Sequence, residues 1–331
     1  MYQPPFEITS KMIELVSRIS EKIGEMSFLM SDDRHITLRK ENRIRTIHSS
    51  LAIENNTLTL EQITAILDGK RVLGSPVEIR EAQNASEIYD ILMSLNPYRE
   101  KDMLKAHKIM MQDLVKNNGR YRDGDVGVLA GERVIHMGPP AKRVPMLMAD
   151  LFAWLKKSDV HPLIKSCVFH YEFEFIHPFD DGNGRMGRLW QTVILKNWKE
   201  VFAWIPVEVL IKEKQAAYYK VLATCDAKGN STDFIEFLLQ LILQTIEEAL
   251  EAEKRVTAKV TVKVTVNQEK IIACLRANPY ITMDELSEKV GISRKSIAAN
   301  IKKLKELGYV SRAGADKNGY WEICAYGINV I

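Results

Sequence analysis

The amino-acid sequence predicts a mainly α-helical fold with one small β-hairpin, followed by a small domain that mixes helices and strands. Apolar residues recur at the three-to-four-residue spacing of a helix along most of the chain before Ala252. The stretch 120–145 differs, because glycines and Pro139-Pro140 separate short apolar pieces there, as is typical of loops and a hairpin. Beyond Asn267, three helical runs precede two short strand-like runs.

The chain's length predicts more than one domain, since a single hydrophobic core rarely serves 331 residues. We predict an N-terminal helical region at 1–100 and a helical core at 101–252. A period-four tract of β-branched and polar residues, 256–267, favours an extended strand over a helix. We therefore expect a linker or extended strand at 253–266 and a separate C-terminal domain at 267–331.

Helices are expected first in the N-terminal region and then on both sides of the hairpin. Turn-forming pairs such as Asn55-Asn56 and Asp68-Gly69 end the runs. The predicted helices span 8–29, 37–53, 60–67, 77–95, 101–115, 144–157, 162–176 and about 185–197, with two or three more up to about 252.

The C-terminal segment has the element order of a winged helix-turn-helix. Helical runs at 268–277, 282–290 and 293–307 precede strand-like runs at 309–312 and 320–323. Ten Lys or Arg and seven Asp or Glu lie in 267–331, so this segment carries all of the chain's +3 excess charge. DNA and protein are alternative partners for it. The basic residues on or near the expected recognition helix include Arg294, Lys295, Lys302 and Lys303.

Composition excludes several other classes of protein. The N-terminus shows no basic start followed by an apolar run, and no stretch approaches the ~18 apolar residues of a membrane span. The four cysteines form no C-x-x-C pair, which argues against a zinc site or a disulfide framework. A cytoplasmic protein that does not contact a membrane is expected.

The most specific pattern is the block His177-Pro-Phe-Asp-Asp-Gly-Asn-Gly-Arg-Met-Gly-Arg188. His177 precedes a proline, which disfavours the helical conformation, so it should end its helix and project from a loop as a proton acceptor. Gly182, Asn183 and Gly184 allow a turn that exposes main-chain N–H groups before the next helix, and such amides bind phosphate. A nucleotide-phosphate site with a general base is therefore predicted.

Charged side chains in the same block complete this site. Arg185 and Arg188 are three residues apart, so they share one helix face and can hold phosphate oxygens. Asp181 offers a hard carboxylate ligand for Mg²⁺ (or Mn²⁺) beside the phosphates. Positioning, charge neutralisation and removal of a proton are the main requirements of phosphoryl-type transfer.

The block matches the Fic family signature HxFx(D/E)GNGRxxR at every specified position. The segments 119–122 and 137–145 resemble those that precede and form that family's target-binding flap. The resemblance implies an all-helical Fic fold whose catalytic core is 101–252, and an enzyme that transfers AMP from ATP to a Tyr, Thr or Ser hydroxyl of a target protein. His177 would deprotonate the hydroxyl, Asp181 would hold the metal, and Asn183 would help to place the α-phosphate.

The same resemblance assigns the hairpin to target binding. The target chain would add as a strand along the edge of the flap through main-chain bonds. The residues concerned are Glu132, Arg133, Val134, Ile135, His136 and Met137.

Ser50-Leu-Ala-Ile-Glu54-Asn55 resembles the family's inhibitory motif, (S/T)xxxE(G/N). Ser50 and Glu54 are one helical turn apart and share a face. Glu54 could pair with Arg188 and occupy the group that the γ-phosphate needs, so that ATP binds with a misplaced α-phosphorus. The motif predicts an enzyme inhibited by its own N-terminal region.

Two other functions remain open at this point. The same site could remove AMP from a target, with Glu54 positioning a water. The protein could instead be a nucleotide-sensing DNA-binding regulator, although sensing would need no base such as His177. The sequence leaves open the target, the donor nucleotide and the oligomeric state, including a homodimer formed through the N-terminal helices.

Overall fold

The structure, a computed structural model, describes residues 2–30, 36–130, 133–261, 265–307, 309–313 and 319–323. It divides into two compact units, Met1–Leu250 and Glu251–Ile331. In the described residues, the regular structure of the first unit is helical apart from one hairpin, and the second is a small α+β unit, so the predicted fold class is confirmed. No helix among the described residues is long and apolar enough to cross a membrane.

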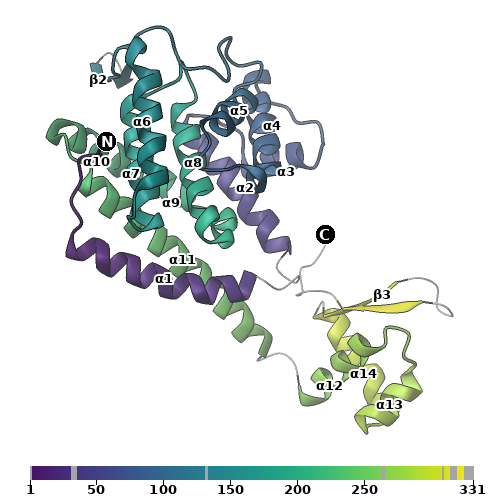
Figure 1. The fold of residues 1–331 in the computed structure, drawn as a ribbon. Helices are drawn as coiled ribbons and strands as arrows, with labels where there is room; N and C mark the ends of the chain where they lie inside the picture. Colours follow the sequence, from purple (N-terminus) through teal and green to yellow (C-terminus); the bar gives the residue numbers. More distant parts are fainter. Residues whose placement is uncertain are drawn as a thin grey trace. The chain divides into compact units, whose positions relative to one another are not determined.

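The first unit carries helices from its beginning to its end, coloured purple to green in Figure 1. The α-helices are α1 (Ser10–Met30), α2 (Ile36–Ile53), α3 (Leu60–Leu67), α4 (Pro76–Asp90), α5 (Glu100–Met110), α6 (Val144–Lys157), α7 (Pro162–Ile176), α8 (Asn183–Trp198), α9 (Val207–Glu213), α10 (Gln215–Lys228) and α11 (Thr232–Thr261). Short 3₁₀ helices are η2 (Leu92–Ser94), η3 (Ala141–Arg143) and η4 (Glu200–Trp204).

Helices α7 and α8 form the centre of this unit, where they pack side by side (Figure 1). Most residues of both helices are buried, and the fully buried large side chains include Phe169, Phe173 and Trp190. A helix that is apolar on most of its faces belongs in a core, where close packing limits its motion. The loop between α7 and α8, which holds the 177–188 block, is therefore fixed at both ends.

The hairpin consists of β1 (Gly127–Ala130) and β2 (Arg133–Met137), paired antiparallel. The register shifts between Val128 and Leu129, as at a β-bulge. The predicted hairpin is therefore present as a two-stranded ribbon, and Glu132 lies outside the described residues.

The second unit contains α12 (Val266–Ala277), α13 (Met283–Val290), α14 (Arg294–Glu306), β3 (Val310–Ala313) and β4 (Tyr320–Ile323). Capping boxes at Thr265 and Thr282 start α12 and α13. Gly291 ends α13 with a φ of 77°, in the left-handed region that glycine adopts readily. The three helices and the antiparallel β3–β4 pair enclose a core of aliphatic side chains and Trp321.

The extended strand predicted for part of 253–266 is wrong. Helix α11 continues to Thr261, and α12 begins at Val266. β-Branched residues lower helix propensity by only tenths of a kcal/mol each, and adding residues to an existing helix is far easier than starting one. The local preference of the Val-Thr repeat was therefore outweighed by the long helix that precedes it.

Candidate active site

His177 ends α7 and projects from the helix, because its backbone is left-handed, with φ 49° and ψ 61°. A non-glycine residue rarely adopts this conformation, which costs about 1–3 kcal/mol and persists only where surrounding contacts impose it. The His177 N–H donates to the Phe173 carbonyl at 2.9 Å, which keeps one helical bond. Pro178 follows and cannot continue the helix.

Arg122 supplies the contacts that impose this geometry. Its Nε donates to the His177 carbonyl oxygen at 2.7 Å, and Nη2 reaches the Ile176 carbonyl oxygen at 3.3 Å. The same guanidinium donates to the carbonyls of Gly124 and Pro139, on either side of the hairpin. Burial lowers the pKa of Arg122, although it remains charged at any ordinary pH. One buried cation therefore ties the base of the hairpin to the end of α7.

Helix α8 begins at Asn183, and its N-cap Gly182 has a φ of 83°. The Asn183 side chain accepts from Phe179 N–H at 2.9 Å and donates to the Phe179 carbonyl at 2.8 Å. These paired bonds fold the loop back on itself and leave the first amides of α8 available for an anion. Asn183 itself is buried, so in this structure its side chain holds the loop.

Arg188 on α8 is clamped by the end of α2. Its Nε donates to Ser50 Oγ at 3.2 Å, and Nη2 donates to the Ser50 carbonyl at 3.0 Å and to Glu54 Oε1 at 2.8 Å. The Arg188 side chain is 1% exposed, whereas that of Glu54 is 31% exposed. Burial alone would lower the pKa of Arg188, but the charge of Glu54 outweighs it and the pKa is raised. The guanidinium is therefore a permanent cation that needs an anionic partner.

Glu54 also lies directly against the start of α8. A Cβ atom built on Gly184 would stand 2.3 Å from Glu54 Oε1 and 3.1 Å from Arg188 Nη1. The carboxylate therefore occupies the surface over the first turn of α8, where a phosphate would meet both the amides and Arg188.

Asn55 ends α2 immediately after Glu54. It has a φ of 68°, and its N–H donates to the Ala52 carbonyl at 3.2 Å. The next N–H, of Asn56, reaches back to the Leu51 carbonyl at 3.2 Å. This pair of bonds is a Schellman motif, in which asparagine is the usual substitute for glycine. Glu54 is thus held at the last turn of a firmly terminated helix.

Glu54, Gly184, Arg188 and His177 line one pocket of about 150 Å³. Its walls come from α7, α8 and α10, and include the half-exposed rings of Phe175 and Tyr219. An apolar pocket with a few convergent charged groups is the usual form of a small-ligand site. The remaining lining residues are Glu174, Tyr218, Leu222, Ala223 and Asp226.

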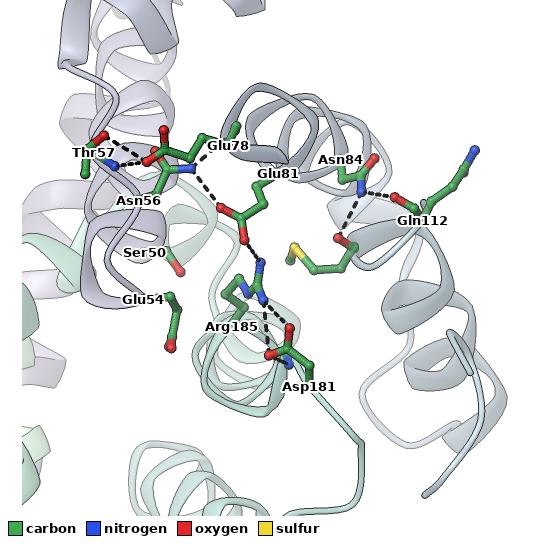
Figure 2. Close-up of polar contacts among 12 residues, drawn as sticks. Ser50, Glu54, Asn56, Thr57, Glu78, Glu81, Asn84, Gln112, Asp181 and Arg185 are labelled. Atoms are coloured by element: carbon green, nitrogen blue, oxygen red, sulfur yellow. Dashed lines mark hydrogen bonds and ion pairs between the residues drawn. The ribbon is translucent and has the colours of Figure 1, made fainter. Parts of the chain in front are cut away.

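Arg185 does not line this pocket, although it lies three residues before Arg188 on the same helix. Its Nη1 donates to Glu81 Oε1 on α4 at 2.8 Å, and its Nη2 lies 3.4 Å from both Asp181 carboxylate oxygens. Figure 2 shows the guanidinium between these two acids. Residues three apart on a helix differ by about 60° in direction, which is enough to send two long side chains to different neighbours.

Residues 97–195 match the Fic/DOC family, and residues 266–311 match a family described as winged helix-turn-helix DNA-binding. A Fic family protein from Desulfovibrio desulfuricans G20, known from its crystal structure, is 44% identical, covers 99% of this chain and is itself covered over 100% of its length. Its TM-score is 0.77. The chain belongs to the Fic family.

More distant members of the Fic family are also similar. Curated proteins named protein adenylyltransferase Fic, from Drosophila erecta and Drosophila melanogaster, are 29% identical over 216 residues. That alignment covers 60% of this chain but only 40% of those proteins. A Fic domain containing signaling protein from Bacteroides thetaiotaomicron is 22% identical, with a TM-score of 0.62 over 72% of this chain and 98% of that chain, and shares its fold.

His107 supports the Fic motif loop, a role that the sequence did not reveal. Its Nδ1 accepts from Gly119 N–H at 2.8 Å, so Nε2 carries the proton and donates to the Asp181 carbonyl at 3.0 Å. The ring stacks on Phe179 with centroids 3.6 Å apart. Burial lowers the pKa of His107 to about 4, so it is neutral at pH 7.

His170 on α7 bonds side chains of α8 and α10 beside the pocket. It is fully buried, and burial lowers its pKa to about 4. Its Nδ1 lies 2.7 Å from Gln191 Oε1 and its Nε2 lies 3.0 Å from the Tyr218 hydroxyl. Neither histidine could be recognised from sequence spacing, because the partners are 12 to 74 residues away.

Asp181 fits a divalent cation that is shared with phosphates. Its side chain is 60% exposed and lies beside the first amides of α8. Mg²⁺ commonly binds one or two carboxylates together with substrate phosphates. No group of three or more His, Cys, Asp or Glu among the described residues could hold a metal by itself. A cation here would therefore take most of its ligands from a bound nucleotide and water.

The predicted basic residues of the second unit lie on α14 with exposed side chains. Arg294 pairs with Asp284 at 3.1 Å, and Lys302 lies 4.0 Å from Glu306. Exposed pairs of this kind are weak and exchange readily for phosphate. Lys295 and Lys303 are exposed on the same helix.

Proposed function

We propose that this chain is a protein adenylyltransferase whose N-terminal region inhibits it. The proposal rests on one observation: His177, Gly184 and Arg188 line the same pocket, which Glu54 also enters. A proton acceptor, a helix N-terminus and a buried cation are the groups that nucleotidyl transfer requires. The similarity to proteins named protein adenylyltransferase Fic supports the same reaction.

The reaction would proceed in one displacement. A Tyr, Thr or Ser hydroxyl of the target attacks the α-phosphorus of ATP, His177 accepts the hydroxyl proton, and pyrophosphate leaves as AMP becomes bonded to the target oxygen. The first amides of α8 and Arg188 hold phosphate oxygens. Asp181 would hold Mg²⁺ (or Mn²⁺), which neutralises phosphate charge when bound.

The hairpin would present the target. Within the described residues its sheet has two strands, so the outer edge of β2 can accept an added strand by main-chain bonding. Arg122 joins the ends of this hairpin to His177. A target chain held on β2 would therefore have a fixed position relative to the His177 side chain, the proton acceptor.

In this proposal Glu54 inhibits transfer because it pairs with Arg188, the cation that a phosphate of ATP would bind. Its Oε1 is 2.8 Å from Arg188 Nη2 and stands over Gly184. ATP can bind productively only after the carboxylate has left, because two anions cannot share this cation at close range. Removal of Glu54 should therefore raise transfer.

The test is incorporation of α-³²P-labelled ATP into the protein itself and into lysate proteins, for wild type, Glu54→Gly, and Glu54→Gly with His177→Ala. We expect weak label in wild type, strong label in Glu54→Gly and none in the double variant. Equal label in wild type and Glu54→Gly would contradict the inhibition. Absence of label in all three would contradict the transferase, whereas loss of AMP from a labelled target would favour the reverse reaction.

A second function, DNA binding by the C-terminal unit, is supported by the match of residues 266–311 to a DNA-binding family and by the exposed basic face of α14. We propose that the full chain retains duplex DNA through Lys295 and Lys303. Lys295→Glu with Lys303→Glu should abolish retention in a gel-shift assay at low salt, where phosphate contacts are strongest. Equal DNA retention by the wild type and the double variant would contradict this second function.

A further inference from the structure

A second set of contacts joins the end of α2 to α8, through a carboxylate on α4. Glu81 Oε1 accepts from Arg185 Nη1 at 2.8 Å, and Glu81 Oε2 accepts from Asn56 Nδ2 at 2.8 Å (Figure 2). Asn56 is the second residue after Glu54. The Glu81 side chain therefore contacts both α8 and the turn that follows Glu54.

Both partners of Glu81 are firmly placed. The side chains of Arg185 and Glu81 are 4% and 16% exposed, so their ion pair is little screened by water. Asn56 is buried, its Nδ2 also reaches the Glu78 carbonyl at 3.2 Å, and its Oδ1 accepts from Leu58 N–H at 3.1 Å. Asn56 thus has a fixed orientation, with one amide hydrogen directed to Glu81.

Arg185 has one close anionic partner in the described structure. Its distance to Glu81 is 2.8 Å, whereas Asp181 lies at 3.4 Å and is more exposed. The direction of the Arg185 guanidinium is therefore set mainly by Glu81. Arg185 in turn lies beside the Asp181 carboxylate, next to the phosphate-binding turn of α8.

We propose that Glu81 is a positioning residue with two effects on the site. It directs Arg185 toward Asp181, and through Asn56 it holds the end of α2 so that Glu54 stays on Arg188. The inference rests on the proposed adenylyltransferase and adds to it a second attachment of the inhibitory helix, independent of the Glu54–Arg188 pair. Phosphate binding near Arg185 and release of Glu54 are then coupled through one carboxylate.

The two effects can be separated by substitution. Asn56→Asp keeps the oxygen that accepts from Leu58 but replaces the donor to Glu81 by a second carboxylate, which weakens the attachment and leaves Arg185 its partner. Glu81→Ala removes both contacts. Thr57→Ala is the matched control, because Thr57 lies in the same turn and its hydroxyl bonds Glu78 Oε1 at 2.9 Å without contacting Glu81.

Each variant is made with Glu54 present and in the Glu54→Gly chain, and is assayed by label transfer and by calorimetric ATP affinity. With Glu54 present, Asn56→Asp should bind ATP several-fold more tightly and transfer AMP several-fold faster than wild type, while Thr57→Ala should match wild type. In the Glu54→Gly chain, Asn56→Asp should have no further effect. Glu81→Ala should there raise the KM for ATP several-fold with a smaller change in kcat.

Three results would overturn the inference. These are wild-type ATP affinity in Asn56→Asp, an equal effect of Asn56→Asp in both backgrounds, and an unchanged KM in Glu81→Ala. Urea unfolding of each variant separates these results from misfolding, and Asn56→Ala replaces any Asn56→Asp protein that does not fold. If the Glu54→Gly single variant transfers no AMP, the proposed function is contradicted instead. The ATP affinities of the variants would still test whether Glu81 couples Arg185 to the position of Glu54.

Discussion

Replacing His107 by Phe tests whether this histidine holds the Fic motif loop. The aromatic stack on Phe179 can be kept, but Gly119 N–H and the Asp181 carbonyl both lose their partner. His107 is 1% exposed, so solvent cannot easily replace these bonds. A buried group left without a partner costs about 1–3 kcal/mol, and both of these bonds are partly buried, so the free energy of unfolding should fall by at most about 2–6 kcal/mol.

The loss of these bonds should also affect the proposed nucleotide site. The Asp181 carbonyl belongs to the residue that precedes Gly182, the N-cap of α8. A loop that is free to shift there no longer presents the amides in one geometry, so ATP affinity should fall at least tenfold in the Glu54→Gly background. Urea unfolding followed by tryptophan fluorescence measures the first effect, and calorimetry measures the second.

His161→Phe provides the matched control. His161 caps α7, where its Nδ1 accepts from Leu163 N–H, and it packs against Trp198, so the substitution also removes a histidine bond. It should reduce stability by about 0.5–2 kcal/mol, as expected for a lost cap, and leave ATP affinity unchanged. The reasoning is refuted if His107→Phe and His161→Phe have the same ATP affinity, or if His107→Phe is destabilised by less than 1 kcal/mol.

Three other substitutions give separate tests. Ser50→Ala removes the acceptor of Arg188 Nε, so label transfer should rise several-fold, though less than in Glu54→Gly, and transfer at the wild-type level would exclude Ser50 from the clamp. Burial raises the pKa of Glu208 to about 7, so the folded chain keeps a proton that the unfolded chain loses from pH 4.5 upward, and stability falls as pH rises through this window. Glu208→Gln should therefore reduce the loss of unfolding free energy between pH 4.5 and 8 by about 3 kcal/mol, and identical urea-unfolding profiles across pH would contradict this. Arg122→Ala should lower kcat at least tenfold and leave ATP affinity unchanged, because the Arg122 guanidinium bonds the carbonyls of Ile176 and His177 and so orients His177 rather than the phosphate site. A raised Kd for ATP would contradict this assignment.

The 177–188 block could be predicted as a unit because its members are contiguous in the sequence. Glycine, asparagine and proline specify the loop locally, and the helix that follows must present its amides. The bounds of α3 were predictable for the same reason, because its capping box lies within its own sequence, at Thr59 and Gln62. The helices predicted at 77–95 and 101–115 end earlier, at Asp90 and Met110.

Partners brought together by tertiary packing could not be predicted from local signals. His107 lies on α5 and Glu81 on α4, and both helices carry several other polar residues. Most polar residues on helices face water, so nothing in the local sequence distinguishes these two. The role of Glu81 depends on α8 packing close to α4, and that of His107 on the loop before α8 packing close to α5. The direction of Arg185 was missed for the same reason, since spacing on a helix fixes a face but not the neighbour that occupies it.

The burial of Arg188 has a consequence for the lifetime of the protein in the cell. Removing one member of a fully buried ion pair commonly costs about 3–5 kcal/mol, because the remaining charge is desolvated without compensation. Loss of Glu54 should cost less than this, because Glu54 is 31% exposed and Arg188 keeps its two Ser50 acceptors. An uninhibited chain would therefore be kept folded partly by its nucleotide, whose phosphates restore an anion beside the guanidinium. The state in which Glu54 pairs with Arg188 needs no such support, since Glu54 already provides the anion. If the inhibition is released as proposed, resistance to proteolysis would depend on the ATP concentration, and a released molecule without ATP would be degraded faster than one with ATP.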